Sequence, residues 1–251
     1  EWGEIEKSIQ IARKGLALSE LWGQTDTIML CLLALFNGLS LANDASAAQA
    51  ILQRAQKIAQ GVSPWFSQIV DQTELQDCLR EGKLDQAAWL AQKLGSKLSA
   101  YLRASLLVKQ NRLNEALAVL EPAIQQAHSS PSLENVRLGV IQSLAYSRKG
   151  DEKQALATLK QTLELAEPEN QVATFLREGA EMEKLLRLAL VKSIHPDFVG
   201  KLLSAFEARR QRQMAPSSVA QQLVEPLTER ELEVLHILDG PLSTPEIANQ
   251  L

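Results

Sequence analysis

The string Gly82-Lys-Leu-Asp-Gln-Ala87 recurs in variant form along the chain. The other copies are Asn43-Asp-Ala-Ser-Ala-Ala48, Asn111-Arg-Leu-Asn-Glu-Ala116 and Gly150-Asp-Glu-Lys-Gln-Ala155, and a looser one is Gly3-Glu-Ile-Glu-Lys-Ser8. Glycine or asparagine at the first position favours the left-handed cap that ends a helix, and the small last residue suits a close approach of two helices. Each string therefore predicts a boundary at which one helix ends and the next begins.

The last residues of these strings lie 29 to 40 positions apart, which is the period of an array of helical hairpins. The residues four and seven positions further on are mostly small or aliphatic, as one helical face requires. They are Ala12, Leu52, Ala91, Leu120 and Leu159, and Gly15, Ala55, Leu94, Ala123 and Thr162. This register resembles that of tetratricopeptide arrays, with longer and less regular repeats. It predicts an all-α fold: a right-handed superhelix of tetratricopeptide-like helical hairpins over residues 1–213.

The composition favours the same fold class. Of 251 residues 45% are hydrophobic, which is enough for a large core, and the low content of 12 Gly, 9 Pro and 4% aromatic residues argues against an all-β fold. A net charge of −4 argues against binding nucleic acid over the whole surface. The longest apolar run, residues 28–36, is too short to cross a bilayer, and no export signal is evident. We expect a cytoplasmic protein with no membrane partner, in which Cys31 and Cys78 are buried, reduced thiols.

After Ala155 the sequence becomes more specific. Residues 163–179, followed by the apolar helix around residues 182–191, resemble the closing segment of the helical-repeat domain in MalT-like activators. These are bacterial regulators with a LuxR-type DNA-binding end. Asn170, Gln171 and Ala173 stand where that family usually has Gly, Tyr and Arg.

One more helix is predicted from about Asp197, before a change in composition. Its apolar face consists of Phe198, Leu202, Leu203 and Phe206, and it ends in Arg209, Arg210 and Arg212. These arginines could contact DNA phosphate beside a DNA-binding domain, or they could form a solvated helix end, and we favour the solvated end because a linker follows. Residues 214–226 contain two prolines and little periodicity, which is typical of a linker.

Residues 227–251 resemble the opening of a LuxR-type helix-turn-helix domain. Thr228 and Glu231 form one capping box, and Ser243 and Glu246 form a second one. The apolar faces of the two expected helices contain Leu232, Leu235 and Leu238, and then Ile247, Ala248 and Leu251. Gly240 precedes Pro241, where the family normally has glycine. Because the recognition helix of this motif would follow Leu251, we expect these residues to be a scaffold that reads no bases.

The resemblance implies a transcriptional regulator in which the repeat array senses a signal. In one hypothesis the array binds a small-molecule effector in its concave groove and controls a C-terminal DNA-binding domain, so that DNA is bound only through the helices that would follow this segment. In the alternative hypothesis the groove is a protein-interaction scaffold that binds a partner or mediates self-association into a homo-oligomer. A closed cavity of a few hundred cubic ångströms would favour the first hypothesis, and an open channel the second.

The sequence offers little for catalysis. The three histidines, His128, His195 and His236, are far apart, and no pair has metal-ligand spacing. Neither a Gly-x-Ser-x-Gly elbow nor a phosphate-binding Gly-x-x-x-x-Gly-Lys loop occurs. We expect no enzyme activity, no metal and no cofactor in this chain.

A basic residue lies seven positions before the last alanine, here called the marker alanine, of three recurring strings. These basic residues are Arg80, Lys109 and Arg148. They could line the groove as a cationic stripe for an anionic ligand. The simpler interpretation, which we favour, is that each lies in the last turn of its helix and complements the helix dipole. Four aromatic residues, Tyr101, Tyr146, Trp65 and Trp89, could stack on a planar ligand, although packing in the core is the more common role of such residues.

Overall fold

The computed structural model describes residues 2–126 and 132–214. Every regular element in these ranges is a helix. The first hairpins contain α1 (Trp2–Leu21), α2 (Thr25–Leu41), α3 (Ala45–Val62), α4 (Pro64–Glu81) and α5 (Leu84–Leu94), followed by the short 3-10 helix η1 (Gly95–Lys97). The rest of the array contains α6 (Ala100–Lys109), α7 (Leu113–Gln126), α8 (Leu133–Lys149) and α9 (Glu152–Ala166). The closing segment contains α10 (Val172–Leu176), α11 (Ala180–Val191) and α12 (Pro196–Met214).

Four of the five recurring strings are the helix boundaries that the sequence predicted. Asn43, Gly82, Asn111 and Gly150 all have a positive φ, between 60° and 83°, so each places the chain in the left-handed conformation that ends a helix. The next helix then begins at once, in two cases with an aspartate as N-cap: Asp44 accepts a hydrogen bond from the Ala47 N–H, and Asp151 from the Gln154 N–H. The fifth string is different, because Gly3 lies inside α1.

The predicted small-residue face is the buried face of the second helix in each hairpin. The marker residues Ala48, Ala87, Ala116 and Ala155 are all buried, whereas Ser8, in the fifth string, is exposed. The helices approach closely at such positions. A Cβ on Gly139 of α8, for example, would contact the side chain of Thr162 of α9. Small residues therefore set the spacing of the hairpins, as the register predicted.

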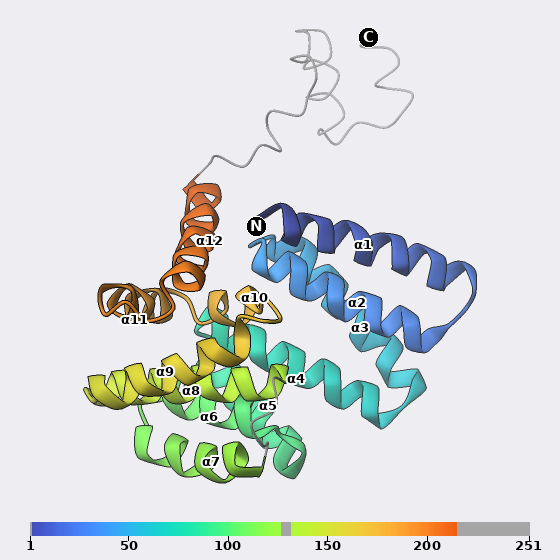
Figure 1. The fold of residues 1–251 in the computed structure, drawn as a ribbon. Coiled ribbons are helices and arrows are strands. Elements are labelled where there is room, and N and C mark those ends of the chain that lie inside the picture. The colour runs from blue at the N-terminus through green and yellow to red at the C-terminus, as the bar shows by residue number, and fades with distance from the viewer. Residues whose placement is uncertain (1, 127–131, 215–251) are drawn as a thin grey trace, which may run out of the picture. The chain divides into compact units, whose positions relative to one another are not determined.

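The hairpins stack in chain order, which makes the fold an all-α helical-repeat superhelix (Figure 1). Helices α2, α4, α6 and α8 are the first helices of successive pairs, and each contacts the next one in this series. Helices α3, α5, α7 and α9 pack on them as the second helices. The inner side of the array is therefore lined by the first helices, as in other helical solenoids.

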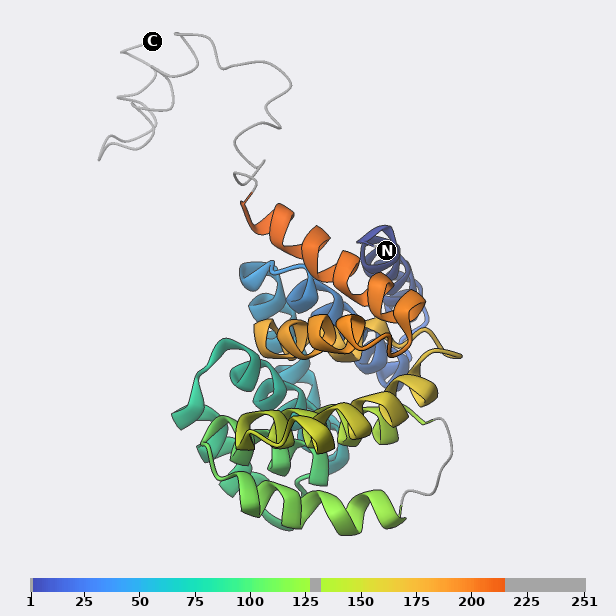
Figure 2. The same ribbon diagram turned by 60° about the vertical axis from the view of Figure 1, so that its left-hand side comes forward.

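The closing segment packs on the last hairpin. Helices α10 and α11 both contact α8, and Phe175 of α10 meets Phe198 of α12 edge to face with ring centroids 6.3 Å apart. The apolar face that the sequence assigned to the helix after Asp197 is buried in the main hydrophobic core. That core also includes Leu41, with Ile5 packed against it. The first and last parts of the array therefore share apolar contacts, and Figures 1 and 2 show α10 and α12 near the N-terminal end of α1.

The chain divides into two compact units, residues 1–210 and 211–251. Residues 215–226 of the predicted linker and the predicted helix-turn-helix segment, residues 227–251, lie outside the described residues. Among the described helices, none combines the length and the hydropathy of a membrane span.

Candidate ligand-binding site

The three basic residues singled out in the sequence lie in the last turns of α4, α6 and α8. Arg148 is fully engaged: its Nε and Nη2 donate to the two carboxylate oxygens of Glu181 at 2.9 and 2.7 Å, and its Nη1 donates to the Val108 carbonyl at 2.6 Å. This side chain therefore links α6, α8 and α11. It stabilises the array and leaves little capacity for a ligand.

Arg80 and Lys109 instead meet at a small cavity on the inner helices. Arg80 donates from Nε to Asp77 at 2.9 Å and lies 3.1 Å from Glu81. The cavity has a volume of about 20 Å³, which is room for one water molecule. It is also lined by Tyr101, Gln76, Arg177 and Glu178. We call these six residues, Gln76, Arg80, Tyr101, Lys109, Arg177 and Glu178, the inner polar cluster.

Tyr101 is the centre of the inner polar cluster. Its side chain is buried, and its hydroxyl accepts a hydrogen bond from Gln76 Nε2 at 3.0 Å and donates one to Glu178 Oε1 at 3.4 Å. Arg137 lies over its ring, 5.6 Å from the centroid. Burial raises the pKa of the Tyr101 hydroxyl, so the residue is a neutral hydrogen-bonding group. The predicted stacking residue is thus a core residue with a satisfied polar tip.

Two members of the inner polar cluster, Arg177 and Glu178, were not recognised in the sequence. They follow α10, in the turn that leads to α11. Desolvation by burial raises the pKa of the Glu178 carboxyl, and desolvation likewise lowers the pKa of the Arg177 guanidinium. Both pKa shifts disfavour the charged form of the group concerned. The turn after α10 therefore holds the Arg177 guanidinium and the Glu178 carboxyl where little water reaches them.

A larger cavity, of about 360 Å³, lies between helices α1 and α2, which are in contact and which we call the first hairpin, and the closing segment. We call it the α2–α10 cavity. Most of its wall is apolar. The apolar side chains come from α1, α2, α10 and α12, and they are Ile5, Ala34, Leu41, Val172, Ala173, Leu176 and Ala205. The polar side chains are Ser8, Asn37, Asn170 and Arg177. An apolar cavity of this size with a few convergent polar groups is the usual form of a small-molecule site.

Arg177 connects the two cavities, because it lines both of them. Its Nη2 donates to Asn37 Oδ1 at 3.1 Å, across 140 positions of sequence. This hydrogen bond joins α2 to the closing segment. A ligand in the α2–α10 cavity would therefore touch both ends of the repeat array at once.

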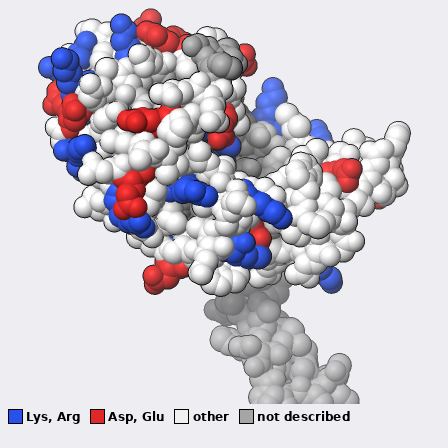
Figure 3. All heavy atoms as spheres, turned by 90° about the horizontal axis from the view of Figure 1, so that it is seen from below, with Lys and Arg blue, Asp and Glu red and all other residues white. Residues whose placement is uncertain are grey.

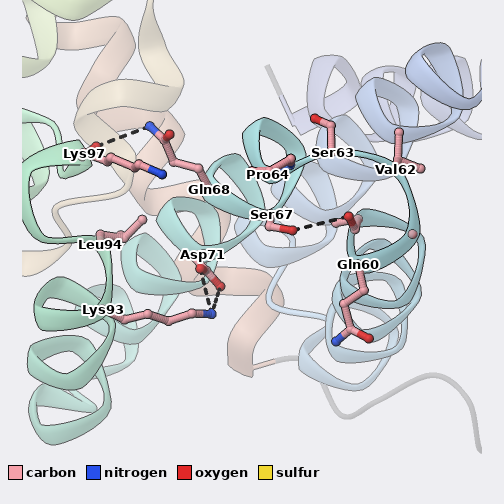
Figure 4. Close-up of a pocket in the computed structure, with 12 residues that line it drawn as sticks. Gln60, Val62, Ser63, Pro64, Ser67, Gln68, Asp71, Lys93, Leu94 and Lys97 are labelled. Carbon is pink, nitrogen blue, oxygen red and sulfur yellow. Dashed lines mark hydrogen bonds and ion pairs between the residues drawn. The ribbon is translucent and has the colours of Figure 1, made fainter.

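A third cavity, of about 480 Å³, lies between the α3–α4 turn and the α5–η1 segment (Figure 4). Two of its charged side chains, Lys93 and Asp71, are already paired with each other. Lys93 Nζ lies 2.7 Å from Asp71 Oδ2, and Gln68 Nε2 donates to the Lys97 carbonyl at 3.4 Å. Because this ion pair already uses two of its charges and much of its wall is polar, this cavity offers a ligand less apolar contact than the α2–α10 cavity does.

The charges on the face shown in Figure 3 are mixed. Lys and Arg side chains lie among Asp and Glu side chains there. A surface that follows a nucleic-acid backbone needs a continuous field of positive sign. The described residues on this face do not form such a continuous field.

A family model described as the MalT-like TPR region matches residues 1–192, which contain α1 to α11. The chain belongs to this family. No curated protein matches the chain, and no solved structure does either. The family match ends before residue 227, so it does not bear on the resemblance to a LuxR-type helix-turn-helix.

Of the other three aromatic residues singled out in the sequence of this MalT-like TPR region, the two tryptophans differ from expectation. Trp65 and Trp89 are 57% and 60% exposed, so the interpretation as core residues was wrong for both. Trp65 packs edge-on against Phe66, and Lys93 lies 5.7 Å from the centroid of the Trp89 ring. Tyr146 is partly buried against the main core. These three rings lie outside the inner polar cluster and do not line the α2–α10 cavity.

The arginines near the end of α12 also differ from one another. Arg209 is not solvated, as the sequence had suggested: its Nη1 donates to the Leu176 carbonyl of α10 at 2.7 Å, and burial lowers the pKa of its guanidinium. Arg210 is exposed and pairs with Glu183 and Glu207, each at 3.4 Å. The Arg212 side chain lies outside the described residues. The closing segment is thus tied together by a buried guanidinium.

The prediction of buried cysteines is confirmed for Cys78 and only in part for Cys31. Cys78 is buried and Cys31 is partly buried, and both are free thiols. Burial raises the pKa of the Cys78 thiol to about 11, which keeps it in the unreactive thiol form. We therefore give neither cysteine a part in the candidate site.

Proposed function

We propose that this MalT-like TPR region is the signal-sensing domain of a transcriptional regulator and binds a small-molecule effector in the α2–α10 cavity. The observation that carries the proposal is the composition of the cavity wall. Residues of the first hairpin and residues of the closing segment form it together. An effector bound there favours the conformation in which these parts are held at this separation, and a change in that equilibrium is what a sensor needs.

The output follows from the position of the closing segment in the chain. Ala205 of α12 lines the cavity, and α12 precedes the segment that resembles a LuxR-type helix-turn-helix. In the proposed regulator, effector binding changes the position or the order of α12 and so controls DNA binding by the domain beyond it. The repeat region itself acts by binding and not by catalysis, with no metal or cofactor of its own.

The test is a thermal-shift screen of the full chain against sugars, amino acids, organic acids and nucleotides. A ligand present at 100 times its dissociation constant adds about 2.7 kcal/mol to the free energy of unfolding. Ala173→Phe fills the α2–α10 cavity from an exposed position on α10 and should abolish the shift. Ala118→Phe, at an exposed position on α7, is the matched control and should retain it. A shift that survives in Ala173→Phe would mean that the ligand binds elsewhere.

A protein-interaction role is the second candidate, because the first hairpin exposes large apolar side chains. In α1 and the turn after it, Ile11, Leu18, Leu21 and Trp22 are 61%, 61%, 79% and 73% exposed. Large apolar side chains that are exposed together on one element are typical of contact sites between proteins. If no compound shifts the unfolding temperature, and sedimentation shows self-association that Leu18→Glu abolishes, the scaffold role replaces the sensor role.

A further inference from the structure

The α2–α10 cavity sets a size for its ligand. At roughly 30 Å³ for each water-sized group, a volume of about 360 Å³ holds about a dozen non-hydrogen atoms. The walls offer mainly aliphatic contact, from Leu41, Val172 and Leu176 among others. The ligand that fits therefore has an apolar body, such as a short alkyl chain or a single aromatic ring.

The charge of the ligand follows from Arg177. Its guanidinium has five N–H donors, and the hydrogen bond to Asn37 uses one of them. Among the described residues it forms no ion pair with a carboxylate. Desolvation by burial is the main cause that lowers the pKa of this guanidinium; Arg137 and Arg80 lower it further, while Tyr101 and Glu178 act in the opposite direction. A poorly solvated cation with free donors at a cavity wall is best satisfied by an anion from the ligand.

Asn37 adds a second contact of the same kind. Its Oδ1 accepts the hydrogen bond from Arg177, so the side-chain NH₂ group is left to donate. One carboxylate could accept from the guanidinium and from this NH₂ group. Two donors from different ends of the array would then converge on one ligand group.

We propose that the α2–α10 cavity binds a small organic acid, with the carboxylate on Arg177 and Asn37 and the apolar body against Leu41, Val172 and Leu176. This assignment rests on the proposed sensor function and narrows its effector to one chemical class. The ligand carboxylate would bind Asn37 of α2 and Arg177 in the turn after α10 at the same time. The group that gives the ligand its specificity would therefore also hold the first hairpin and the closing segment together.

The experiment compares acids with amides of the same size by titration calorimetry on the full chain. The probes are phenylacetate and octanoate, and their neutral counterparts are phenylacetamide and octanamide. Hydrogen bonds to charged groups are stronger than neutral ones, so the acids should bind at least about tenfold more tightly than the amides. In Arg177→Gln this preference should disappear. Arg187→Gln removes an exposed guanidinium on α11 and should leave the preference unchanged.

A second variant keeps the test decisive if Arg177→Gln folds poorly. Asn37→Asp places a carboxylate beside Arg177, where it satisfies the guanidinium and repels an acidic ligand. It should weaken binding of the acids and leave binding of the amides intact.

The outcomes separate the two proposals. If the amides bind as tightly as the acids and Ala173→Phe blocks both, the sensor function stands and the organic-acid assignment is overturned. If neither the probes nor any compound of the wider screen binds, both are overturned. A preference for acids that persists in Arg177→Gln overturns the role of Arg177.

Discussion

Arg148 shows how a residue predicted for binding is used by the fold. Its side chain is 24% exposed, and its three hydrogen bonds connect α6, α8 and α11. The sequence located it in the last turn of a helix but could not show its partner, because Glu181 lies 33 positions away in another helix. Arg148 therefore lies where a cation complements the helix dipole, and it also forms an ion pair with Glu181. It is not free to take part in a cationic stripe for a ligand.

Replacing Arg148 with Ala should lower the free energy of unfolding by about 2 kcal/mol, because charge-assisted hydrogen bonds are lost and Glu181 is left without its partner. Urea denaturation measures this change. Lys149→Ala, at an exposed position in the same turn, is the control and should change the stability by less than about 0.5 kcal/mol. An equal effect of the two variants would show that the contacts of Arg148 contribute nothing.

Glu178 should make the stability depend on pH. Burial raises its pKa in the folded protein above the ordinary value of 4.5. The protonated form is favoured by folding, so its contribution to stability is complete below the unfolded-state pKa and is lost as the pH rises through the folded-state pKa. Glu178→Gln, which stays neutral, should therefore gain stability relative to the native chain as the pH rises from about 4 to about 7.

Denaturation of both chains at several pH values measures this gain. Glu121→Gln, on the exposed surface of α7, is the reference for a surface carboxylate. If the difference between Glu178→Gln and the native chain falls as the pH rises, the assigned direction of the pKa shift is wrong.

At the scale of the helices, the feature that the sequence predicted best is the close approach of paired helices at small residues. The four alanines that end the recurring strings, Ala48, Ala87, Ala116 and Ala155, are buried, and Gly139 of α8 faces Thr162 of α9. Thr162 is held in place, because its Oγ1 donates to the Thr158 carbonyl at 2.8 Å. Gly139→Ala should therefore destabilise the chain by about 1–3 kcal/mol through overpacking.

Gly200 provides the matched control. It lies inside α12, and a Cβ there would meet nothing within 4 Å, so Gly200→Ala should raise the stability by about 0.5–1 kcal/mol. Adding Thr162→Ala to Gly139→Ala should recover part of the loss, and a double-mutant cycle measures the coupling. If the two alanine substitutions have the same sign, helix propensity and not close approach decides their effect.

Helix boundaries were predictable where a local signal existed. Glycine or asparagine in the left-handed conformation ends a helix regardless of its distant neighbours, so the boundaries at Asn43, Gly82, Asn111 and Gly150 follow from the sequence. Gly3 is also a glycine at the first position of a recurring string, but it lies inside α1. Glycine can adopt the left-handed conformation that ends a helix, but it does not have to. The sequence did not predict that Trp65 and Trp89 are exposed. The helical period of the apolar residues does not show which face of a helix is covered by a neighbouring helix.

At the scale of the whole molecule, the repeat fixes the stacking of hairpins but not the cavity. Successive hairpins contact their sequence neighbours, so the period alone predicts the array. The α2–α10 cavity instead depends on contacts between the first hairpin and the closing segment, such as Arg177 with Asn37. No periodic signal encodes such a contact, which is why Arg177, Glu178 and Asn37 were absent from the sequence prediction. The predicted residues Arg80, Lys109 and Tyr101 do meet, but at a cavity too small for an effector.

The central claim is that one ligand joins the two ends of the array, and hydrogen exchange tests it most directly. Amide exchange should be measured over the full chain with and without saturating phenylacetate. We predict slower exchange in α1 and α2 and also in α10 to α12, with little change in α5 and α7, which do not line the cavity. Exchange that is unchanged at both ends, or slowed at one end only, would contradict the claim.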